Sequence, residues 1–181
     1  MPLINAKFLF LDRDGVINKR IENDYIRDWE SFEFIEGSLV AVCELSKLFD
    51  RTFIVTNQRG VGLGLMSDAD LNKIHEELAA NIKLNSGRLD AIYSCIDRDQ
   101  DSLCRKPNTG MALQAKLDFP EVDFKSSIIV GDSSSDMAFG RRLGMLTAFI
   151  GQVDDLGEME VDFVSPSLFK FYNECYLKLN D

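Results

Sequence analysis

Two aspartates two residues apart stand where a short apolar segment ends near the N-terminus. Residues 7–12 include an unbroken apolar run, which predicts a buried strand, and this strand leads into Asp12-Arg13-Asp14-Gly15. In extended backbone the side chains of residues i and i+2 point to the same side, and carboxylates that close repel each other unless a cation or a proton offsets their charge. The motif could bind a divalent cation or perform acid–base chemistry, although a solvated Asp-Gly turn explains it equally well when it is taken alone.

Polar and cationic side chains follow the next two apolar segments. Thr56-Asn57 lies at the end of a second predicted strand, 52–56, and its hydroxyl and amide could donate hydrogen bonds to an anion. Arg105-Lys106-Pro107 comes after the third predicted strand, and Pro107 disfavours helical backbone at Lys106. Two adjacent cations in an acidic protein fit a phosphate site. Each segment alone is also explained as an ordinary polar loop.

A second pair of aspartates follows the fourth predicted strand, 127–131. Asp132 lies at the strand tip, and Asp136 falls early in the next predicted helix, where the helix dipole favours a carboxylate. A structural N-cap accounts for one of these aspartates more readily than for both. Because carboxylates, a hydroxyl and a cation recur at separate strand ends, their combination favours one shared site.

The segments between these motifs predict an alternation of strands and helices. Apolar runs predict strands at 7–12, 52–56, 89–94, 127–131 and 146–150, with a short sixth at 161–164. Apolar residues at helical spacing predict helices at 38–49, from the N-cap Ser67 to about 85, at 111–117, at 136–143 closed by Gly144, and at 167–179. Repeated β-α units predict an α/β fold over residues 1–181, a single domain whose mostly parallel sheet is covered on both faces and binds ligands at the carboxyl ends of its strands.

Composition narrows the class of protein. The chain has 181 residues, a formal net charge of −10 and 45% hydrophobic residues, which suits one globular domain. The acidic excess disfavours nucleic acid and anionic membranes as partners. No segment approaches the roughly 20 apolar residues of a membrane span, and the N-terminus shows no signal peptide. The four cysteines suggest no disulfide framework, so we expect a protein of the reducing cytoplasm. We also expect it to be a monomer.

Taken together, these motifs resemble those of the haloacid dehalogenase (HAD) superfamily of phosphatases. The matching residues are Asp12-Arg13-Asp14-Gly15, Thr56, Lys106 and Gly131-Asp132 with Asp136, within residues 7–150. Segments 12–18, 32–37, 56–58 and 104–107 are similar to the heptose 1,7-bisphosphate phosphatases, and the histidinol-phosphate phosphatases share most of them. The resemblance implies a Rossmann-like three-layer sandwich. The segments after Gly15 and after Cys95 are too short to hold the folded cap domain of many relatives, so we expect an open cleft.

The resemblance implies a role for each motif. Asp12 would attack phosphorus and form an aspartyl-phosphate, and Asp14 would protonate the leaving alkoxide and then deprotonate the attacking water. Mg²⁺ would be bound by Asp12, the backbone carbonyl of Asp14, and Asp132, because hard oxygen ligands suit this ion. Thr56 and Lys106 would hold the phosphoryl oxygens in the transition state.

Further residues would support the site or bind the substrate. Asp136 would orient Lys106 or a metal-bound water without contacting the substrate. Arg105 is the first candidate for contacting the part of the substrate that does not react. The other substrate-binding candidates are Asn57, Arg20 and Arg59, and a solvated surface position is the alternative for the last two.

A zinc-binding loop that many heptose bisphosphate phosphatases carry is only half matched. Cys95 and Cys104 correspond to its outer cysteines, but Asp97 stands where the family has His and Ser102 where it has another Cys. A structural zinc site normally has four nitrogen or sulfur ligands, so we expect no zinc.

The sequence leaves three functions open. The favoured one is Mg²⁺-dependent hydrolysis of a small sugar phosphate, with the 7-phosphate of D-glycero-D-manno-heptose 1,7-bisphosphate as the first choice. Histidinol phosphate or another small phosphomonoester is the second, and a non-catalytic phosphate-binding or scaffold protein of the same fold is the third. The single histidine, His75, is expected to face solvent from a helix, which argues against a Ser-His-Asp triad. Cys43 and Cys175 are expected to be buried thiols.

Overall fold

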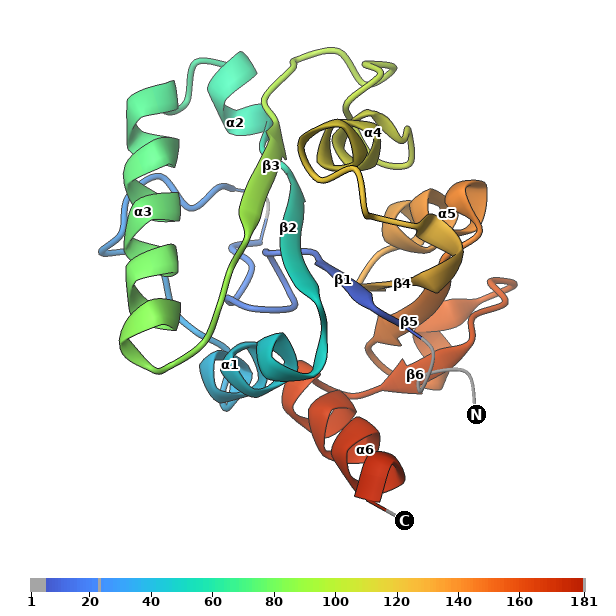
Figure 1. The fold of residues 1–181 in the computed structure, drawn as a ribbon. Coiled ribbons are helices and arrows are strands. Elements are labelled where there is room, and N and C mark those ends of the chain that lie inside the picture. The colour runs from blue at the N-terminus through green and yellow to red at the C-terminus, as the bar shows by residue number, and fades with distance from the viewer. Residues whose placement is uncertain (1–5, 23, 181) are drawn as a thin grey trace.

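A six-stranded parallel sheet forms the centre of the molecule (Figure 1). The computed structural model describes residues 6–22 and 24–180, with side chains as far as residue 174. The strands lie in the order β3-β2-β1-β4-β5-β6, and each neighbouring pair is parallel. Their bounds are β1 Phe8–Leu11, β2 Arg51–Asn57, β3 Ala91–Cys95, β4 Ser127–Gly131, β5 Leu146–Ile150 and β6 Phe163–Ser165. The predicted α/β fold with a parallel sheet is confirmed, including the short sixth strand.

Helices cover both faces of this sheet. They are α1 Ser38–Leu48, α2 Arg59–Gly62, α3 Asp68–Leu84, α4 Gly110–Asp118, α5 Ser134–Leu143 and α6 Leu168–Asn180, with short 3-10 turns at Phe124–Ser126 and Val153–Leu156. In Figure 1, α1, α3 and α6 lie on one side of the sheet, and α4 and α5 lie on the other. The arrangement is therefore a three-layer sandwich. The short helix α2 was not expected from the sequence.

The apolar run of β1 is continuous because both faces of the strand are buried. Leu9 and Leu11 pack in the cluster that includes α1, α3 and α6, whereas Phe8 and Phe10 pack in the cluster that includes α4 and α5. Successive strand side chains point to opposite faces, so a strand with a helix layer on each side needs apolar residues at every position.

Side-chain caps set the beginnings of α3 and α5. Ser67 accepts a hydrogen bond from the backbone N–H of Asp70, whose carboxylate accepts one in return from the Ser67 N–H, as the predicted N-cap requires. Ser133 and Asp136 form the same capping box, so α5 begins at Ser134, earlier than predicted. Gly144 ends this helix in the left-handed region with a φ of 71°, as expected.

The loop between β1 and α1 forms one wall of the region above the carboxyl ends of the strands. Among residues 12–22 and 24–37 the structure has no helix and no strand longer than an isolated bridge. Ile17, Ile26 and Phe32 are buried and attach the loop to the core, and Trp29 stacks on Phe32 with 4.7 Å between ring centroids. This loop is ordered by its own hydrophobic contacts and can position polar side chains.

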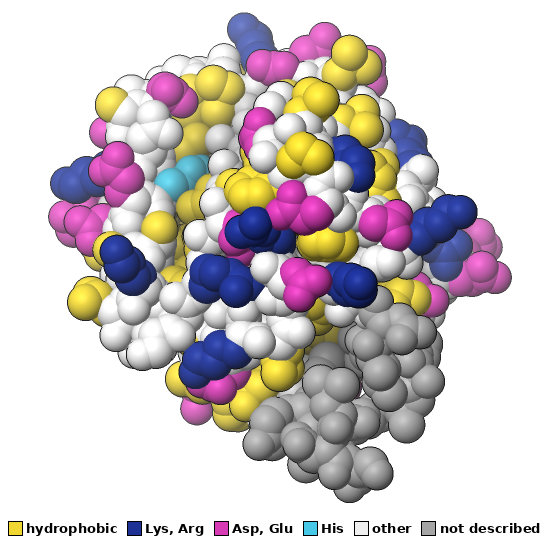
Figure 2. Space-filling view, in the orientation of Figure 1, with side chains coloured by type: hydrophobic (Ala, Val, Ile, Leu, Met, Phe, Trp, Pro, Cys, Tyr) yellow, Lys and Arg dark blue, Asp and Glu magenta, His cyan; other side chains and the backbone are white. Residues whose placement is uncertain are grey.

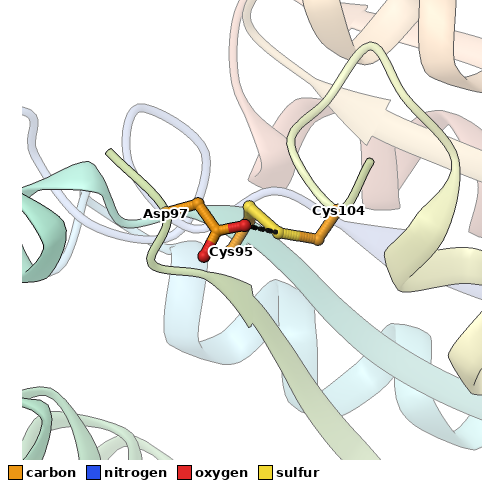
Figure 3. Close-up of side chains that lie close together, drawn as sticks. All are labelled: Cys95, Asp97 and Cys104. Atoms are coloured by element: carbon orange, nitrogen blue, oxygen red, sulfur yellow. Dashed lines mark hydrogen bonds between the residues drawn. A yellow bond between two sulfur atoms is a disulfide. The ribbon is translucent and has the colours of Figure 1, made fainter. Parts of the chain in front are cut away.

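The loop after β3 contains a disulfide that the sequence did not suggest. Cys95 and Cys104 are bonded through sulfur, with their Cα atoms 5.4 Å apart (Figure 3). The cysteine composition suggested no disulfide framework, and the structure corrects this for one pair, because a single crosslink within a short loop leaves no trace in composition. Cys43 is a buried free thiol, as predicted. The side chain of Cys175 lies outside the described residues.

Acidic and basic side chains are interspersed on the face of the molecule seen in Figure 2, with hydrophobic groups between them. That face carries no broad field of one charge. Among the described residues no helix combines the length and the apolar character that a bilayer crossing requires.

Candidate active site

Polar side chains from neighbouring strands meet at the carboxyl ends of β2, β1 and β4. Asp12 directly follows β1, Thr56 belongs to the last residues of β2, and Asp132 directly follows β4. Lys106 reaches the same place from the loop between β3 and α4, and Asp136 reaches it from the first turn of α5. The structure therefore brings together residues that the sequence placed at four separate strand ends.

The buried ammonium group of Lys106 is the centre of this arrangement. Its Nζ donates hydrogen bonds to Asp12 Oδ1 at 2.8 Å and to the backbone carbonyl of Val55 at 2.6 Å, and it lies 2.6 Å from Asp136 Oδ1 as an ion pair. Burial favours the neutral amine, but the charges of Asp12 and Asp136 outweigh burial and raise the pKa of Lys106. Lys106 is thus a fixed cation beside Asp12.

Asp12 and Asp132 are carboxylates that the protein makes hard to ionise. Burial, and then the charge of Asp136, raise the pKa of Asp12 to about 7, against the opposing effect of Lys106. Burial also raises the pKa of Asp132 to about 6. Oxygen atoms of Asp12, Asp132 and Asp136 all lie within 4.8 Å of one another. Crowded carboxylates whose ionisation is opposed fit a hard divalent cation, which would supply the charge that ionises them.

Asp136 is held by its own helix and presents one oxygen to Lys106. Its Oδ2 accepts hydrogen bonds from the Ser133 hydroxyl at 2.5 Å and the Ser133 N–H at 3.1 Å, while Oδ1 faces Lys106. A side chain at Gly131 could not fit, because its Cβ would lie 2.3 Å from the Asp136 Cβ. The capping box therefore fixes a carboxylate that orients Lys106.

Asp14 is the carboxylate that the protein keeps ionised. Its two oxygens accept hydrogen bonds from Asn18 Nδ2 at 2.9 Å, Gln58 Nε2 at 2.7 Å and Arg13 Nη2 at 3.0 and 3.1 Å. Burial alone would raise the pKa of Asp14, but the Arg13 charge and these donors outweigh it and lower the pKa. Gly15 has a φ of +90°, and a Cβ there would lie 1.8 Å from Asp132 Oδ2, so only glycine lets the two loops approach this closely.

His75 contacts this network, which corrects the expectation that it faces solvent. Its Nε2 lies 3.2 Å from Arg13 Nη1, and Arg13 itself is fully buried. Because a guanidinium group only donates, His75 must accept through Nε2 and is therefore neutral. Burial, and then the charge of Arg13, lower the pKa of His75 to about 3. Sequence reasoning gave no role to Arg13, Gln58 or His75.

Thr56 and Asn57 have different surroundings, although they are adjacent. Thr56 Oγ1 accepts a hydrogen bond from Gln58 Nε2 at 2.8 Å and lines the cleft. Asn57 accepts from the Lys106 N–H at 3.0 Å and donates to the Lys106 carbonyl at 3.2 Å. Asn57 therefore ties the end of β2 to the loop that carries Lys106, in addition to lining the cleft.

A cleft of about 470 Å³ opens above these residues. Arg20 and Arg105 line it together with Tyr25, and Arg105 Nη1 is buried without a hydrogen-bond partner among the described residues. Arg20 forms an ion pair with Asp132 at 2.9 Å. Arg59 is not among the lining residues, and its Nε donates to the Arg98 carbonyl at 2.9 Å. The structure therefore brings two of the three candidate arginines into the cleft.

The partly matched zinc loop has no pair of free thiolates in this structure. The sulfurs of Cys95 and Cys104 are joined to each other, and Asp97 Oδ2 lies 3.5 Å from Cys104 Sγ (Figure 3). A disulfide sulfur carries no negative charge for a zinc ion, because only the thiolate is the metal ligand. The ligand atoms of Cys95, Asp97 and Cys104 lie within 4.8 Å of one another, which is three groups where a structural zinc site normally has four nitrogen or sulfur ligands.

Comparison with known proteins identifies sequence relatives that cover 71% of the chain. A family model described as HAD-hydrolase-like matches residues 103–166. The chain is 41% identical over 130 residues to the D-glycero-alpha-D-manno-heptose-1,7-bisphosphate 7-phosphatase of Mycobacterium tuberculosis H37Rv, covering 71% of this chain and 68% of that protein. It is 36% identical over 137 residues to the D-glycero-beta-D-manno-heptose-1,7-bisphosphate 7-phosphatase of Escherichia coli K12, covering 71% of this chain and 70% of that protein.

A solved structure gives the same relationship in three dimensions. The D,D-heptose 1,7-bisphosphate phosphatase of B. bronchiseptica, determined with magnesium and phosphate, superimposes with a TM-score of 0.85 at 26% identity. The superposition covers 96% of this chain and 99% of that one.

Proposed function

The chain belongs to the heptose-1,7-bisphosphate 7-phosphatase family of the HAD superfamily, and from this premise we propose that it removes the 7-phosphate of D-glycero-D-manno-heptose 1,7-bisphosphate. The observation that carries the proposal is the contact of Lys106 with Asp12 and Asp136 at the foot of an open cleft. A buried cation beside a buried carboxylate suits the transfer of an anionic phosphoryl group. The two arginines of the cleft add positive charge for the second phosphate.

Asp12 is proposed as the nucleophile. One of its carboxylate oxygens attacks phosphorus, the bond between phosphorus and the sugar oxygen breaks, and an aspartyl-phosphate forms. Lys106 holds one Asp12 oxygen and offsets charge on the phosphoryl group as it transfers. Thr56 lines the cleft and can donate its hydroxyl proton to a phosphoryl oxygen.

Asp14 is proposed as the acid and base. It gives a proton to the leaving sugar oxygen, then takes one from the water that attacks the aspartyl-phosphate, and inorganic phosphate leaves with the Asp12 carboxylate restored. The donors around Asp14 lower its pKa, so it needs the negative charge of an incoming phosphate to become protonated. Its neighbours Arg13, Asn18 and Gln58 hold it in one orientation.

Mg²⁺ is the proposed cofactor. Asp12, Asp132 and the backbone carbonyl of Asp14 would hold it, and the raised pKa values of the two carboxylates support a doubly charged ion there. When bound, the ion supplies positive charge that draws the anionic nucleophile and the anionic substrate together. We also propose a zinc-free, monomeric protein of the cytoplasm, without nucleic-acid or membrane partners. The net charge of −10 supports the absence of nucleic-acid and anionic-membrane partners.

The test is a substrate panel measured on the wild type and on Asp12→Asn. The asparagine side chain keeps the shape of aspartate but cannot act as an anionic nucleophile, so turnover of p-nitrophenyl phosphate with Mg²⁺ should fall to background. Equal turnover by the two proteins would reject the enzymatic role and leave a phosphate-binding protein. Among substrates, the heptose 1,7-bisphosphate should be hydrolysed with higher kcat/KM than histidinol phosphate. Higher efficiency on histidinol phosphate would reject the proposed substrate.

A further inference from the structure

Arg20 touches two of the oxygen atoms that the proposed metal ion would use. Its Nη2 donates to Asp132 Oδ1 at 2.9 Å and to the backbone carbonyl of Asp14 at 3.3 Å. These contacts join the loop after β1 to the end of β4. Both acceptors belong to the proposed Mg²⁺ ligands, so Nη2 of Arg20 occupies oxygen atoms that the ion would need.

A guanidinium group and Mg²⁺ cannot use these oxygens in the same way. Mg²⁺ sits about 2.0–2.1 Å from its oxygen ligands, closer than any hydrogen-bonding nitrogen. An ion bound to Asp132 and to the Asp14 carbonyl would therefore lie next to the Arg20 Nη2, and two positive groups at that distance repel each other. Binding of the ion requires Arg20 to leave.

We propose that Arg20 is a displaceable cation that competes with Mg²⁺ for Asp132 and the Asp14 carbonyl, and that on release it turns into the cleft to bind the phosphate that does not react. The inference rests on the proposed function. Arg20 then has two alternative partners: Asp132 and the Asp14 carbonyl when the metal site is empty, and the phosphate that does not react when Mg²⁺ is bound.

The surroundings of Arg20 hold its side chain only weakly. Its side chain is 54% exposed, and a single nitrogen makes both contacts. An exposed ion pair of this kind is weak, because solvent screens it and a long side chain loses freedom on forming it. Lys106 is the opposite case, since its ammonium is buried and held by Asp12, Asp136 and Val55. Of the two proposed metal-binding aspartates, Asp12 thus pairs with a permanent cation and Asp132 with a removable one.

The released side chain has a place to act. Arg20 already lines the cleft, as does Arg105, whose buried Nη1 has no partner among the described side chains and backbone groups. Two guanidinium groups on one cleft suit an anion with several oxygens. If metal frees Arg20 for the substrate, metal binding and phosphate binding strengthen each other, and by linkage the effect is mutual.

The test measures Mg²⁺ binding by calorimetry without any substrate, so that it does not depend on turnover. Arg20→Gln removes the competing charge and should bind Mg²⁺ about two- to fivefold more tightly than the wild type, the range expected for loss of an exposed ion pair. Lys19→Gln is the matched control: it removes one positive charge from the neighbouring residue, whose ammonium pairs with Glu33. The control should change the Mg²⁺ affinity by less than Arg20→Gln.

A second measurement tests the other half of the inference. In saturating Mg²⁺, the KM for the bisphosphate substrate should rise in Arg20→Gln, whereas the inhibition constant of inorganic phosphate should stay unchanged. Thermal unfolding of both variants without metal checks that each is folded. The inference is rejected if Arg20→Gln leaves Mg²⁺ affinity unchanged or matches the control. That result would leave the proposed phosphatase intact, whereas tighter Mg²⁺ binding without any turnover would reject the phosphatase and keep the competition.

Discussion

Replacing Lys106 with Met should destabilise the protein strongly, and more so at high pH than at low pH. Met fills a similar volume but leaves the carboxylates of Asp12 and Asp136 buried without their cation. Removing one partner of a buried ion pair costs about 3–5 kcal/mol, against a total stability of about 5–15 kcal/mol for a domain. We expect the upper half of that range at pH 8, because Lys106 faces two carboxylates at 2.8 and 2.6 Å and is almost fully buried.

The pH dependence follows from the pKa of Asp12. It is already raised to about 7 with Lys106 present, and Lys106 is the group that opposes the rise. In Lys106→Met the pKa of Asp12 rises further, so the folded variant holds a proton that the unfolded chain releases above about pH 4. A folded state that binds more protons than the unfolded state loses stability as pH rises. At pH 5 the carboxylate is protonated in either protein, and the difference shrinks.

Urea unfolding in EDTA at pH 5 and pH 8 measures this difference without interference from metal. Lys125→Met is the control, because Lys125 is exposed and its loss should change the stability by less than about 0.5 kcal/mol. Phosphatase turnover by Lys106→Met should also fall by about 10²–10³-fold, the size expected when one group that stabilises transition-state charge is removed. A stability loss like that of the control, or one that is equal at both pH values, would refute the ion-pair reasoning.

Three further predictions concern metal, histidine and the disulfide. The pKa values of Asp12 and Asp132 are raised to about 7 and 6, so at lower pH Mg²⁺ must displace protons from these carboxylates in order to bind. Added Mg²⁺ should therefore raise the melting temperature of the protein more at pH 8 than at pH 5.5. Equal increases at the two pH values would contradict the proposed ligands. Because the pKa of His75 is lowered to about 3, the free energy of unfolding should fall as pH falls below about 6.5, by about 2–3 kcal/mol at pH 4.5. His75→Gln should remove this loss when unfolding by urea is measured across that pH range. An unchanged dependence of stability on pH in the variant would show that His75 titrates normally. Alkylation of the denatured, unreduced protein should modify only two of the four cysteines, and four modified cysteines would exclude the crosslink between Cys95 and Cys104. Cys104→Ser should lower the free energy of unfolding by about 2–3 kcal/mol.

The strand ends could be predicted because an unbroken apolar run marks both the strand and the residue at which it ends. A parallel strand covered on both faces must be apolar throughout, so the first charged residue after the run marks where it leaves the core. Asp12 and Asp132 follow β1 and β4 in this way, and the pairing of β1 with β4 puts them side by side. Lys106 needed more information, since it comes from a loop, and only its place among the matched motifs indicated its partners.

The position of His75 was predicted wrongly, although the helix that carries it was predicted correctly. His75 lies four residues after Leu71 and three before Leu78, both of which are buried on α3. Residues at these spacings lie on the same helix face, so the periodicity of the helix puts His75 at the edge of the buried stripe, and the expectation that His75 faces solvent did not take this into account. What the sequence lacks is the partner, because Arg13 lies 62 residues away and no local pattern predicts that it is buried. Arg20 and Asp132, 112 residues apart, are a pair of the same kind.

Asp12 and Asp14 lie two residues apart, yet the protein shifts their pKa values in opposite directions, and this difference suits two different tasks. Burial and neighbouring carboxylates hold Asp12 back from ionising, whereas Arg13 and two amide donors keep Asp14 ionised against the effect of burial. A bound cation favours the ionised form of the nucleophile, and a bound anion favours the protonated form of the acid, so turnover would depend on metal and substrate together. Under the proposed function, Arg20 adds to this dependence, because the ion that ionises Asp12 also frees a guanidinium for the second phosphate. The order of events would then be set by electrostatics, with metal first and substrate second, and without any movement of the sheet that carries the site.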